Sequence, residues 1–354
     1  MPSTDAILVI GPAWVGDMVM AQSLFLRIQE RRPETAIDVM APACTVPLLE
    51  RMPQVRNALP MPLTHGQLQL GARWRLGKAL RGRYAQAIVL PNSLKSALIP
   101  FAAGIPKRTG FVGELRYGLL NDIRKLDKTA LPKTVLRFLH LADPPGSAPP
   151  ETIPQPRLRV SDACVSETLD AHTLSTDNGS ILALCPGAEY GPAKRWPARH
   201  FAQVAEHHLN NGGQVWLFGS EKDRPVTAEM LEHAPGCRDL AGKTSLNQAI
   251  NLLSLADCII SNDSGLMHVA AALNRPLMAV YGSSVPGFTP PLSDNHRILS
   301  LNLECSPCFR RSCPLGHTHC LNQLHPGPLP RRGIRPRKTL ARPPFRPGGG
   351  TPLE

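Results

Sequence analysis

The stretch SNDSGLMHVAAALNRPLMAVYGSS, residues 261–284, has the pattern of a strand, a helix and a second strand. The apolar run directly before it is long enough for a buried strand, and Asn262, Asp263 and Ser264 are residue types that cap helix N-termini. We therefore expect a helix that begins at Ser264 or Gly265 and stops at the Arg-Pro pair that follows. Such a helix points free N–H groups and the positive end of its dipole at the turn, where a diphosphate would bind well.

The same alternation of strands and helices extends over the rest of the chain. Apolar runs predict strands at 6–10, 37–40, 86–90, 181–184 and 214–218. Helices are expected from Asp17 onward, over 46–52 and 93–103, and after residues 197 and 219. Parallel strands joined by helices end at one edge of a sheet, so the pattern predicts an α/β protein with two doubly wound, Rossmann-like domains facing a central crevice.

Composition divides the chain into three parts. Residues 143–156 are rich in proline, which predicts a linker between a first domain, 1–156, and a second domain, 157–325. The last 33 residues contain eight prolines and seven Lys or Arg against one Glu. This composition predicts that 326–354 is a disordered basic tail.

The overall composition excludes several classes of protein. The chain has 354 residues, of which 42% are hydrophobic, and it contains neither an apolar run of membrane-spanning length nor a signal peptide. Nine cysteines, an odd number, favour a reducing compartment, so we expect a cytoplasmic protein. The net charge is +12, but the sequence contains no nucleic-acid-binding motif and no interleaving of aromatic and basic residues. We therefore expect no nucleic-acid partner.

Asp17 is the candidate catalytic base. It follows the first predicted strand at the end of the loop GPAWVG, residues 11–16, where open parallel sheets place their ligands. A carboxylate that faces the crevice could remove the proton from an attacking hydroxyl group. The alternative is structural, because an acid in the first turn of a helix also interacts favourably with the helix dipole.

Lys194 and Arg195 are the candidate phosphate ligands. They end the loop PGAEYGPAKRWP, residues 186–197, after a strand and before a helix N-terminus, and two cations in this position can neutralise a departing diphosphate. The alternative is a solvated basic loop. Glu221, after the next strand, is a candidate for binding ribose hydroxyls, or simply an acid at a helix N-terminus.

Four cysteines near the end of the second domain have close spacing. Cys305, Cys308, Cys313 and Cys320 enclose two histidines and could bind zinc. The second pair lacks the short spacing of a zinc knuckle, so we favour reduced structural thiols or a redox-labile cluster over a zinc site.

Five motifs together carry a family resemblance. They are the loop ending at Asp17, the stretch GIPKRTGF at 104–111, the loop at 186–197, the NDSG turn at 262–265, and the segment from ECSPC at 304–308 to Cys320. This set resembles the ADP-heptose:lipopolysaccharide heptosyltransferases of glycosyltransferase family 9. The first and the last of these motifs favour the branch of that family that adds the second heptose.

The resemblance implies a GT-B fold and an inverting, metal-independent transfer of L-glycero-D-manno-heptose from ADP-heptose, with no cofactor required. It implies an acceptor of lipid A, Kdo and one heptose, bound by the first domain at the cytoplasmic face of the inner membrane, with the protein attached peripherally. Asp17 would be the base and Lys194 the phosphate ligand of the second, ADP-sugar-binding domain. The donor turn would consist of Asp263, Ser264, Gly265 and His268, and Glu221 is a looser match for the ribose.

Two other functions fit some of the same features. Another sugar-nucleotide enzyme, such as a heptosyltransferase I-like protein or an epimerase, could use the same crevice. A non-catalytic protein that binds zinc or nucleic acid could be built on the cysteine segment and the basic tail.

Overall fold

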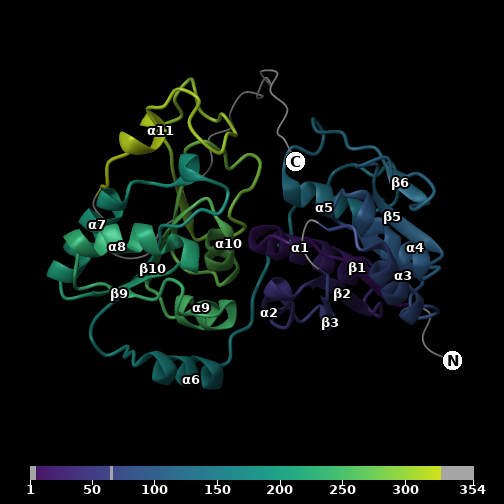
Figure 1. Ribbon diagram of the computed structural model, residues 1–354, viewed down its shortest axis with the longest axis horizontal. Coiled ribbons are helices and arrows are strands. Elements are labelled where there is room, and N and C mark those ends of the chain that lie inside the picture. The colour runs from purple at the N-terminus through teal and green to yellow at the C-terminus, as the bar shows by residue number, and fades with distance from the viewer. Residues whose placement is uncertain (1–4, 64–66, 328–354) are drawn as a thin grey trace.

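The computed structural model describes residues 5–63 and 67–327, and it contains two six-stranded sheets in which all strands are parallel. The first sheet has the order β3-β2-β1-β4-β5-β6 and the second the order β12-β11-β10-β7-β8-β9. Helices flank both sheets (Figure 1). The predicted fold class is therefore confirmed. The strands are β1 (Ile7–Ile10), β2 (Ile37–Pro42), β3 (Val55–Met61), β4 (Gln86–Val89), β5 (Lys107–Phe111), β6 (Asp122–Arg124), β7 (Ile181–Cys185), β8 (Gln214–Leu217), β9 (Arg238–Asp239), β10 (Cys258–Asn262), β11 (Leu277–Val280) and β12 (His296–Leu299).

Each sheet has one point at which the strand order reverses. In the first sheet it lies between β1 and β4, and in the second between β7 and β10. Ligands of doubly wound sheets bind beyond the carboxyl ends of the strands at such points. The helices that follow these strands are thus positioned beside the site. The helices are α1 (Val15–Arg31), α2 (Val46–Leu49), α3 (Leu70–Ala79), α4 (Leu98–Ala102), α5 (Thr134–Ala142), α6 (Asp162–His172), α7 (Ala198–Asn210), α8 (Arg224–His233), α9 (Leu246–Leu253), α10 (Gly265–Ala272) and α11 (His319–Asn322).

Helices α1 and α10 join the two halves of the molecule. They lie side by side at its centre (Figure 1), and buried residues of both belong to one continuous hydrophobic core that reaches into each sheet. Glycines permit this contact. A Cβ atom at Gly16 would lie 2.6 Å from Cδ2 of His268, and one at Gly265 would lie 2.9 Å from Cβ of Val15. Only residues without a side chain let the two helix N-termini approach so closely.

Three predicted helices differ from the observed ones, and one of them is α2, which ends at Leu49 and not at residue 52. Helix α1 begins at Val15, two residues before Asp17, so Asp17 lies in its first turn. The helix expected over 93–103 is divided into a 3-10 turn, η2 (Leu94–Ala97), and α4. Pro100 explains the division, because proline fits the first turn of an α-helix but not its interior. The α-helix can therefore begin only shortly before it.

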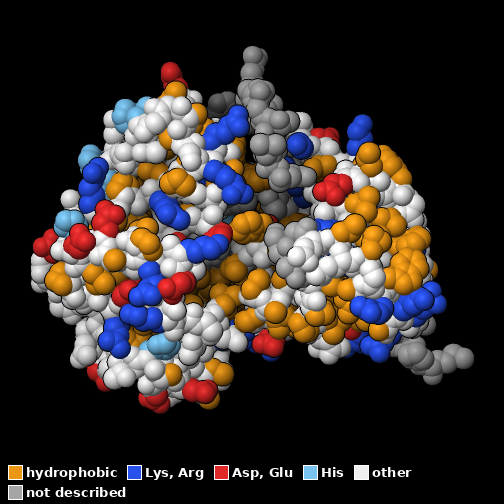
Figure 2. Space-filling view, in the orientation of Figure 1, with side chains coloured by type: hydrophobic (Ala, Val, Ile, Leu, Met, Phe, Trp, Pro, Cys, Tyr) orange, Lys and Arg blue, Asp and Glu red, His pale blue; other side chains and the backbone are white. Residues whose placement is uncertain are grey.

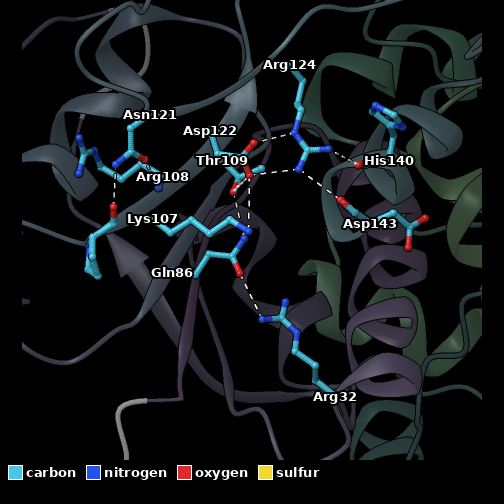
Figure 3. Close-up of polar contacts among 11 residues, drawn as sticks. Arg32, Gln86, Lys107, Arg108, Thr109, Asn121, Asp122, Arg124, His140 and Asp143 are labelled. Atoms are coloured by element: carbon cyan, nitrogen blue, oxygen red, sulfur yellow. Dashed lines mark hydrogen bonds and ion pairs between the residues drawn. The ribbon is translucent and has the colours of Figure 1, made fainter. Parts of the chain in front are cut away.

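The predicted linker is held against the first domain. The carbonyl oxygens of Pro154 and Arg157 accept hydrogen bonds from Ser23 (2.7 Å) and Gln22 (2.8 Å) of α1. Its first residue, Asp143, accepts a bond from Arg124 at the end of β6 (3.2 Å), and the same guanidinium binds Asp122 (Figure 3). The predicted disordered tail falls mostly at 328–354, outside the described residues.

Candidate active site

The carboxyl group of Asp17 lies where the two domains meet. Burial raises its pKa to about 6, the positive charge of Lys194 counteracts part of that rise, and the negative charge of Asp263 adds to it. Both of these partners belong to the second domain. The fold therefore brings the predicted base next to the predicted phosphate ligand, 177 residues further along the chain.

Lys194 is bound to Asp263. Its Nζ atom lies 2.6 Å from Oδ2 of Asp263, and Oδ2 also accepts a hydrogen bond of 2.5 Å from the hydroxyl of Ser284. The ammonium group lies 5.1 Å from the centre of the Tyr190 ring, close enough for a cation–π interaction. Lys194 ends the short 3-10 turn η3 (Pro192–Lys194), so its position is fixed by the backbone and by the side chains of Asp263 and Tyr190.

Asn262 connects the two loops that hold these residues. Its side-chain oxygen accepts a hydrogen bond from the backbone N–H of Trp196 (3.0 Å), and its amide group donates one to the carbonyl of Pro186 (2.7 Å). Trp196 is buried and donates a further bond to the carbonyl of Leu324 (2.7 Å). The loop at 186–197 is thus a fixed structure and not a solvated basic loop.

The N-terminus of α10 has a different arrangement from the expected one. The helix begins at Gly265, as predicted, but Asn262 and Asp263 bind the Lys194 loop and do not cap the helix. Ser264 occupies the N-cap position, and in the described part of the chain its side chain makes no capping hydrogen bond. The predicted start of the helix is confirmed, but the side chains of Asn262 and Asp263, whose residue types favour capping, bind tertiary partners instead. The first N–H groups of α10 remain available to an anion.

His268 lies on the face of α10 that contacts α1. It is 5% exposed and packs against Gly16, and burial lowers its pKa to about 4, with Asp263 raising and Lys194 further lowering the value. The ring is therefore neutral at pH 7. It fills the space at the helix crossing and carries no charge of its own into the site.

Arg195 and Glu221 occupy two further positions around the site. The Nε atom of Arg195 is buried and has no hydrogen-bond partner among the described residues, although Nη2 contacts the carbonyl of Ala188 (3.4 Å). Glu221 lies beyond β8 in the 3-10 turn η4 (Glu221–Asp223), where its exposed carboxylate forms an ion pair of 2.8 Å with Arg224. No interaction in the described structure links Glu221 to Asp17, Lys194 or Asp263.

The four closely spaced cysteines line one small cavity together with Ala193 and Ser283. Backbone N–H groups, that of Thr318 first, lower the pKa of Cys313, whereas burial and then the neighbouring thiols raise that of Cys320. Within 5–63 and 67–327, no group of three or more His, Cys, Asp or Glu residues is arranged to hold a metal ion. A zinc site at these cysteines therefore stays a prediction, and the arrangement of their side chains does not support it. The four residues are Cys305, Cys308, Cys313 and Cys320.

An open cavity of about 630 Å³ lies on the first domain. Asn92, Phe111 and Lys125 in its wall follow or end β4, β5 and β6, so the cavity lies at the carboxyl ends of these strands, and exposed Tyr117 also lines it. This cavity was not predicted, because only Phe111 of its wall belongs to a recognised motif, GIPKRTGF, and the other lining residues lie outside that motif. Ser284, Tyr190 and Asn262 were also missed as parts of the site. Ser284 had a signal, since it follows a predicted strand beside the donor turn.

The site thus lies where the two Rossmann-like domains meet, with a carboxylate of the first domain near a cation and uncapped helix N–H groups of the second. Residues 73–319 match glycosyltransferase family 9 (heptosyltransferase), and the chain belongs to this family. It is 54% identical over 306 residues to lipopolysaccharide heptosyltransferase 2 of Escherichia coli (strain K12), which covers 83% of this chain and 88% of that protein. Lipooligosaccharide heptosyltransferase 2 of Haemophilus influenzae (strain ATCC 51907 / DSM 11121 / KW20 / Rd) is 50% identical over the same share of each chain.

A solved structure agrees with these relatives. That of E. coli ADP-heptose LPS heptosyltransferase II superposes with a TM-score of 0.79 at 48% identity, covering 90% of this chain and 98% of that one. The protein is therefore a glycosyltransferase, and the alternative classes raised by the sequence are not favoured.

Proposed function

We propose that the protein transfers L-glycero-D-manno-heptose from ADP-heptose onto the first heptose of the lipopolysaccharide inner core. The observation that carries this proposal is the approach of Asp17, from the first domain, to Lys194 and Asp263, from the second. A base on one side and a phosphate ligand on the other are what a direct glycosyl transfer needs. The names of the relatives supply the sugar and the donor.

Asp17 is the base of the proposed reaction. Its carboxylate accepts the proton of the attacking acceptor hydroxyl while that oxygen forms a bond to the anomeric carbon. The bond between this carbon and the diphosphate oxygen breaks, and its electron pair leaves with ADP. One displacement of this kind inverts the anomeric configuration. A pKa of about 6 leaves Asp17 mostly ionised at neutral pH while keeping it basic enough to take a proton.

The leaving diphosphate is stabilised by the second domain. Lys194 and the free N–H groups of α10 meet its negative charge, and the unpaired Nε of Arg195 supplies a further donor. Asp263 and Ser284 position Lys194. Ser264 and Gly265 form the turn against which the donor packs, His268 supports that turn from within α10, and Glu221 binds the ribose. The reaction requires no cofactor and no metal.

The acceptor is attached to lipid A, so the protein works at the cytoplasmic face of the inner membrane and binds it peripherally. Among the helices of the described residues, none is long and apolar enough to cross a membrane. The cavity on the first domain is the place proposed for the acceptor, because it opens at the carboxyl ends of β4, β5 and β6.

The test is a transfer assay with purified protein, ADP-heptose and a core acceptor that carries one heptose. Mass spectrometry should detect the addition of one heptose, whereas an acceptor without heptose and the donors UDP-glucose and UDP-GlcNAc should give no product. Equal transfer to the heptose-free acceptor would reassign the protein to the first step of the core. Transfer from a UDP sugar in preference to ADP-heptose would reject the proposed donor.

A further inference from the structure

One stretch of the first domain is basic and contains no acidic residue. From Arg51 to Gly113 the sequence contains ten Lys or Arg and no Asp or Glu. Four of the cations, Arg75, Lys78, Arg81 and Arg83, are exposed on α3 or directly after it. Across the described residues, none of these four takes part in an ion pair. Their charge is therefore free to attract an anionic partner.

Large apolar side chains are exposed in the same stretch. Leu68 is 49% exposed, Leu70 51%, Trp74 41% and Phe101 38%. The rings of Trp74, on α3, and Phe101, on α4, have their centres 6.2 Å apart, and the guanidinium of Arg108 lies 5.5 Å from the Phe101 ring centre. We call these five residues together with Arg75, Lys78, Arg81 and Arg83 the α3–α4 face. In Figure 2, orange side chains gather over the edge where α3 and α4 lie, with blue side chains beside them.

The helices that carry the α3–α4 face are packed tightly together. Helices α3 and α4 pack so closely that a Cβ atom at Gly77 would lie 2.6 Å from both Cβ of Ala102 and the carbonyl oxygen of Ile99. Buried Arg73 donates a hydrogen bond of 2.7 Å to the carbonyl of Leu68, which holds the segment before α3. The exposed aromatic rings are thus presented outward by a rigid helix pair, and their exposure is a property of the fold.

We propose that the α3–α4 face binds the anionic phospholipid surface of the membrane that carries the acceptor, an inference that rests on the proposed function. Tryptophan and phenylalanine bind at the level of the lipid headgroups, and lysine and arginine are attracted by anionic lipid. A nucleic acid could also bind the positive charges. The exposed leucines and the aromatic pair, however, suit the apolar boundary between lipid headgroups and acyl chains. Few soluble proteins expose clustered apolar side chains without a partner for them.

The face is connected to the cavity proposed for the acceptor. Helix α4 continues directly from η2, and the backbone N–H of Leu94, in η2, donates a hydrogen bond of 2.8 Å to Glu114. The N–H of Glu114 in turn binds the carbonyl of Asn92, which lines the cavity (3.0 Å). A bilayer bound at the α3–α4 face would therefore place its lipid-linked acceptor on the same rigid unit as the cavity.

Vesicle sedimentation tests the proposal without donor or acceptor, so its result is independent of the proposed reaction. Full-length protein is mixed with vesicles of phosphatidylcholine alone or of phosphatidylcholine with phosphatidylglycerol. We expect binding to the anionic vesicles only. The charge variant Arg75→Gln, Lys78→Gln, Arg81→Gln and the apolar variant Leu70→Ser, Trp74→Ser should each weaken it by about tenfold or more.

A matched control removes three exposed cations from the other domain, as Arg199→Gln, Arg238→Gln and Lys243→Gln. It should bind anionic vesicles within about twofold of the unmodified protein. The charge variant uses only exposed residues, and an unchanged melting temperature shows that it folds. Turnover of a deacylated, water-soluble acceptor should be equal for all variants, and turnover of a vesicle-borne acceptor should fall with binding.

Three results would overturn the assignment. The first is unchanged vesicle binding by both α3–α4 variants, which would place the membrane contact elsewhere, such as in the basic C-terminal residues that all variants share. The second is an equal loss in the control, which would show attraction by net charge without a defined face. The third is self-association of the protein through the α3–α4 face, with no binding to anionic vesicles.

Discussion

The Nζ atom of Lys194 lies 2.6 Å from Oδ2 of Asp263, so the cation proposed to meet the donor's diphosphate already has an anionic partner. A largely buried cation without an anionic partner would be costly. Asp263 supplies that partner and holds the Lys194 side chain in place before the donor binds. The position of Lys194 is thus prepared by a residue that need not touch the reacting atoms.

Replacing Lys194 with alanine should weaken ADP binding and slow transfer together. The variant loses the positive charge and leaves Asp263 without its ion-pair partner. The binding free energy of ADP should therefore weaken by about 2 kcal/mol, which is roughly a 30-fold increase in Kd. Calorimetry with ADP at low salt measures this. The control is Lys243→Ala, because Lys243 is an exposed lysine whose ammonium binds a backbone carbonyl at 3.0 Å. Normal ADP binding by Lys194→Ala would show that the phosphate site lies elsewhere.

Asp17→Asn should reduce transfer by at least about 100-fold, because an amide cannot accept the proton from the acceptor. ADP binding should stay within a few-fold, since the donor binds mainly to the second domain. In the unmodified enzyme, kcat/KM should rise with pH and reach half its maximum near pH 6, where Asp17 loses its proton. Retained turnover in the asparagine variant would remove Asp17 from the mechanism.

The same substitution should change the pH dependence of folding. The pKa of Asp17 is about 6 in the folded protein against an ordinary value of 3.8, so the folded state holds the proton more tightly. The stability this provides is complete below about pH 4 and is lost as the pH rises through 6. Asp17→Asn should therefore be more stable than the unmodified protein above pH 6, by at most about 3 kcal/mol. Melting temperatures at pH 4 and pH 7.5 measure this, and equal differences at both would contradict it.

Replacing the glycines at the crossing of α1 and α10 with alanine should destabilise the fold. Gly16→Ala and Gly265→Ala place a methyl group 2.6 Å from His268 and 2.9 Å from Val15, respectively, and should each cost about 1–3 kcal/mol. Gly71→Ala is the matched control, since it lies in helix α3 with no described atom within 4 Å of the added Cβ. It should be neutral or stabilising by up to about 1 kcal/mol. Denaturant unfolding distinguishes these outcomes.

Cys313 should be the first thiol to react with iodoacetamide. Backbone N–H groups lower its pKa, whereas burial raises the pKa of Cys237 to about 11 and that of Cys258 to about 12. Because the thiolate is the nucleophile, a lower pKa means faster alkylation near neutral pH. Peptide mass spectrometry after brief labelling gives the order. Metal analysis of the same preparation tests zinc, and stoichiometric zinc lost in Cys305→Ser would establish a metal site.

The sequence predicted the fold class because local patterns determine the central strands, whereas the strands β3, β5, β6, β9 and β12 were not predicted. The unit β10, α10, β11 lies where its apolar runs and glycine indicated, with α10 beginning at Gly265. The loops bearing Asp17 and Lys194 were also identified, because loops that follow parallel strands lie at one edge of a sheet. These predictions needed only neighbours in sequence.

The details that failed depend on partners far away in the chain. Asn262 has the residue type of a helix cap, yet it binds Pro186 and Trp196, and no local pattern could show this competition. The rise in the pKa of Asp17 similarly depends on burial against a second domain. The exposed aromatic pair of the α3–α4 face could not be predicted either. Trp74 and Phe101 have the residue types of a core, and their exposure is evident only from the three-dimensional arrangement of the helices.

The close contact of α1 with α10 couples the two domains at the site itself. Glycines bring the two helix N-termini together at a point where the hydrophobic core is continuous between the domains. Asp17 lies in the first turn of α1 and His268 lies in α10, so both side chains belong to the helices that make this contact. A change that loosens the helix crossing should therefore displace the proposed base and the donor turn together.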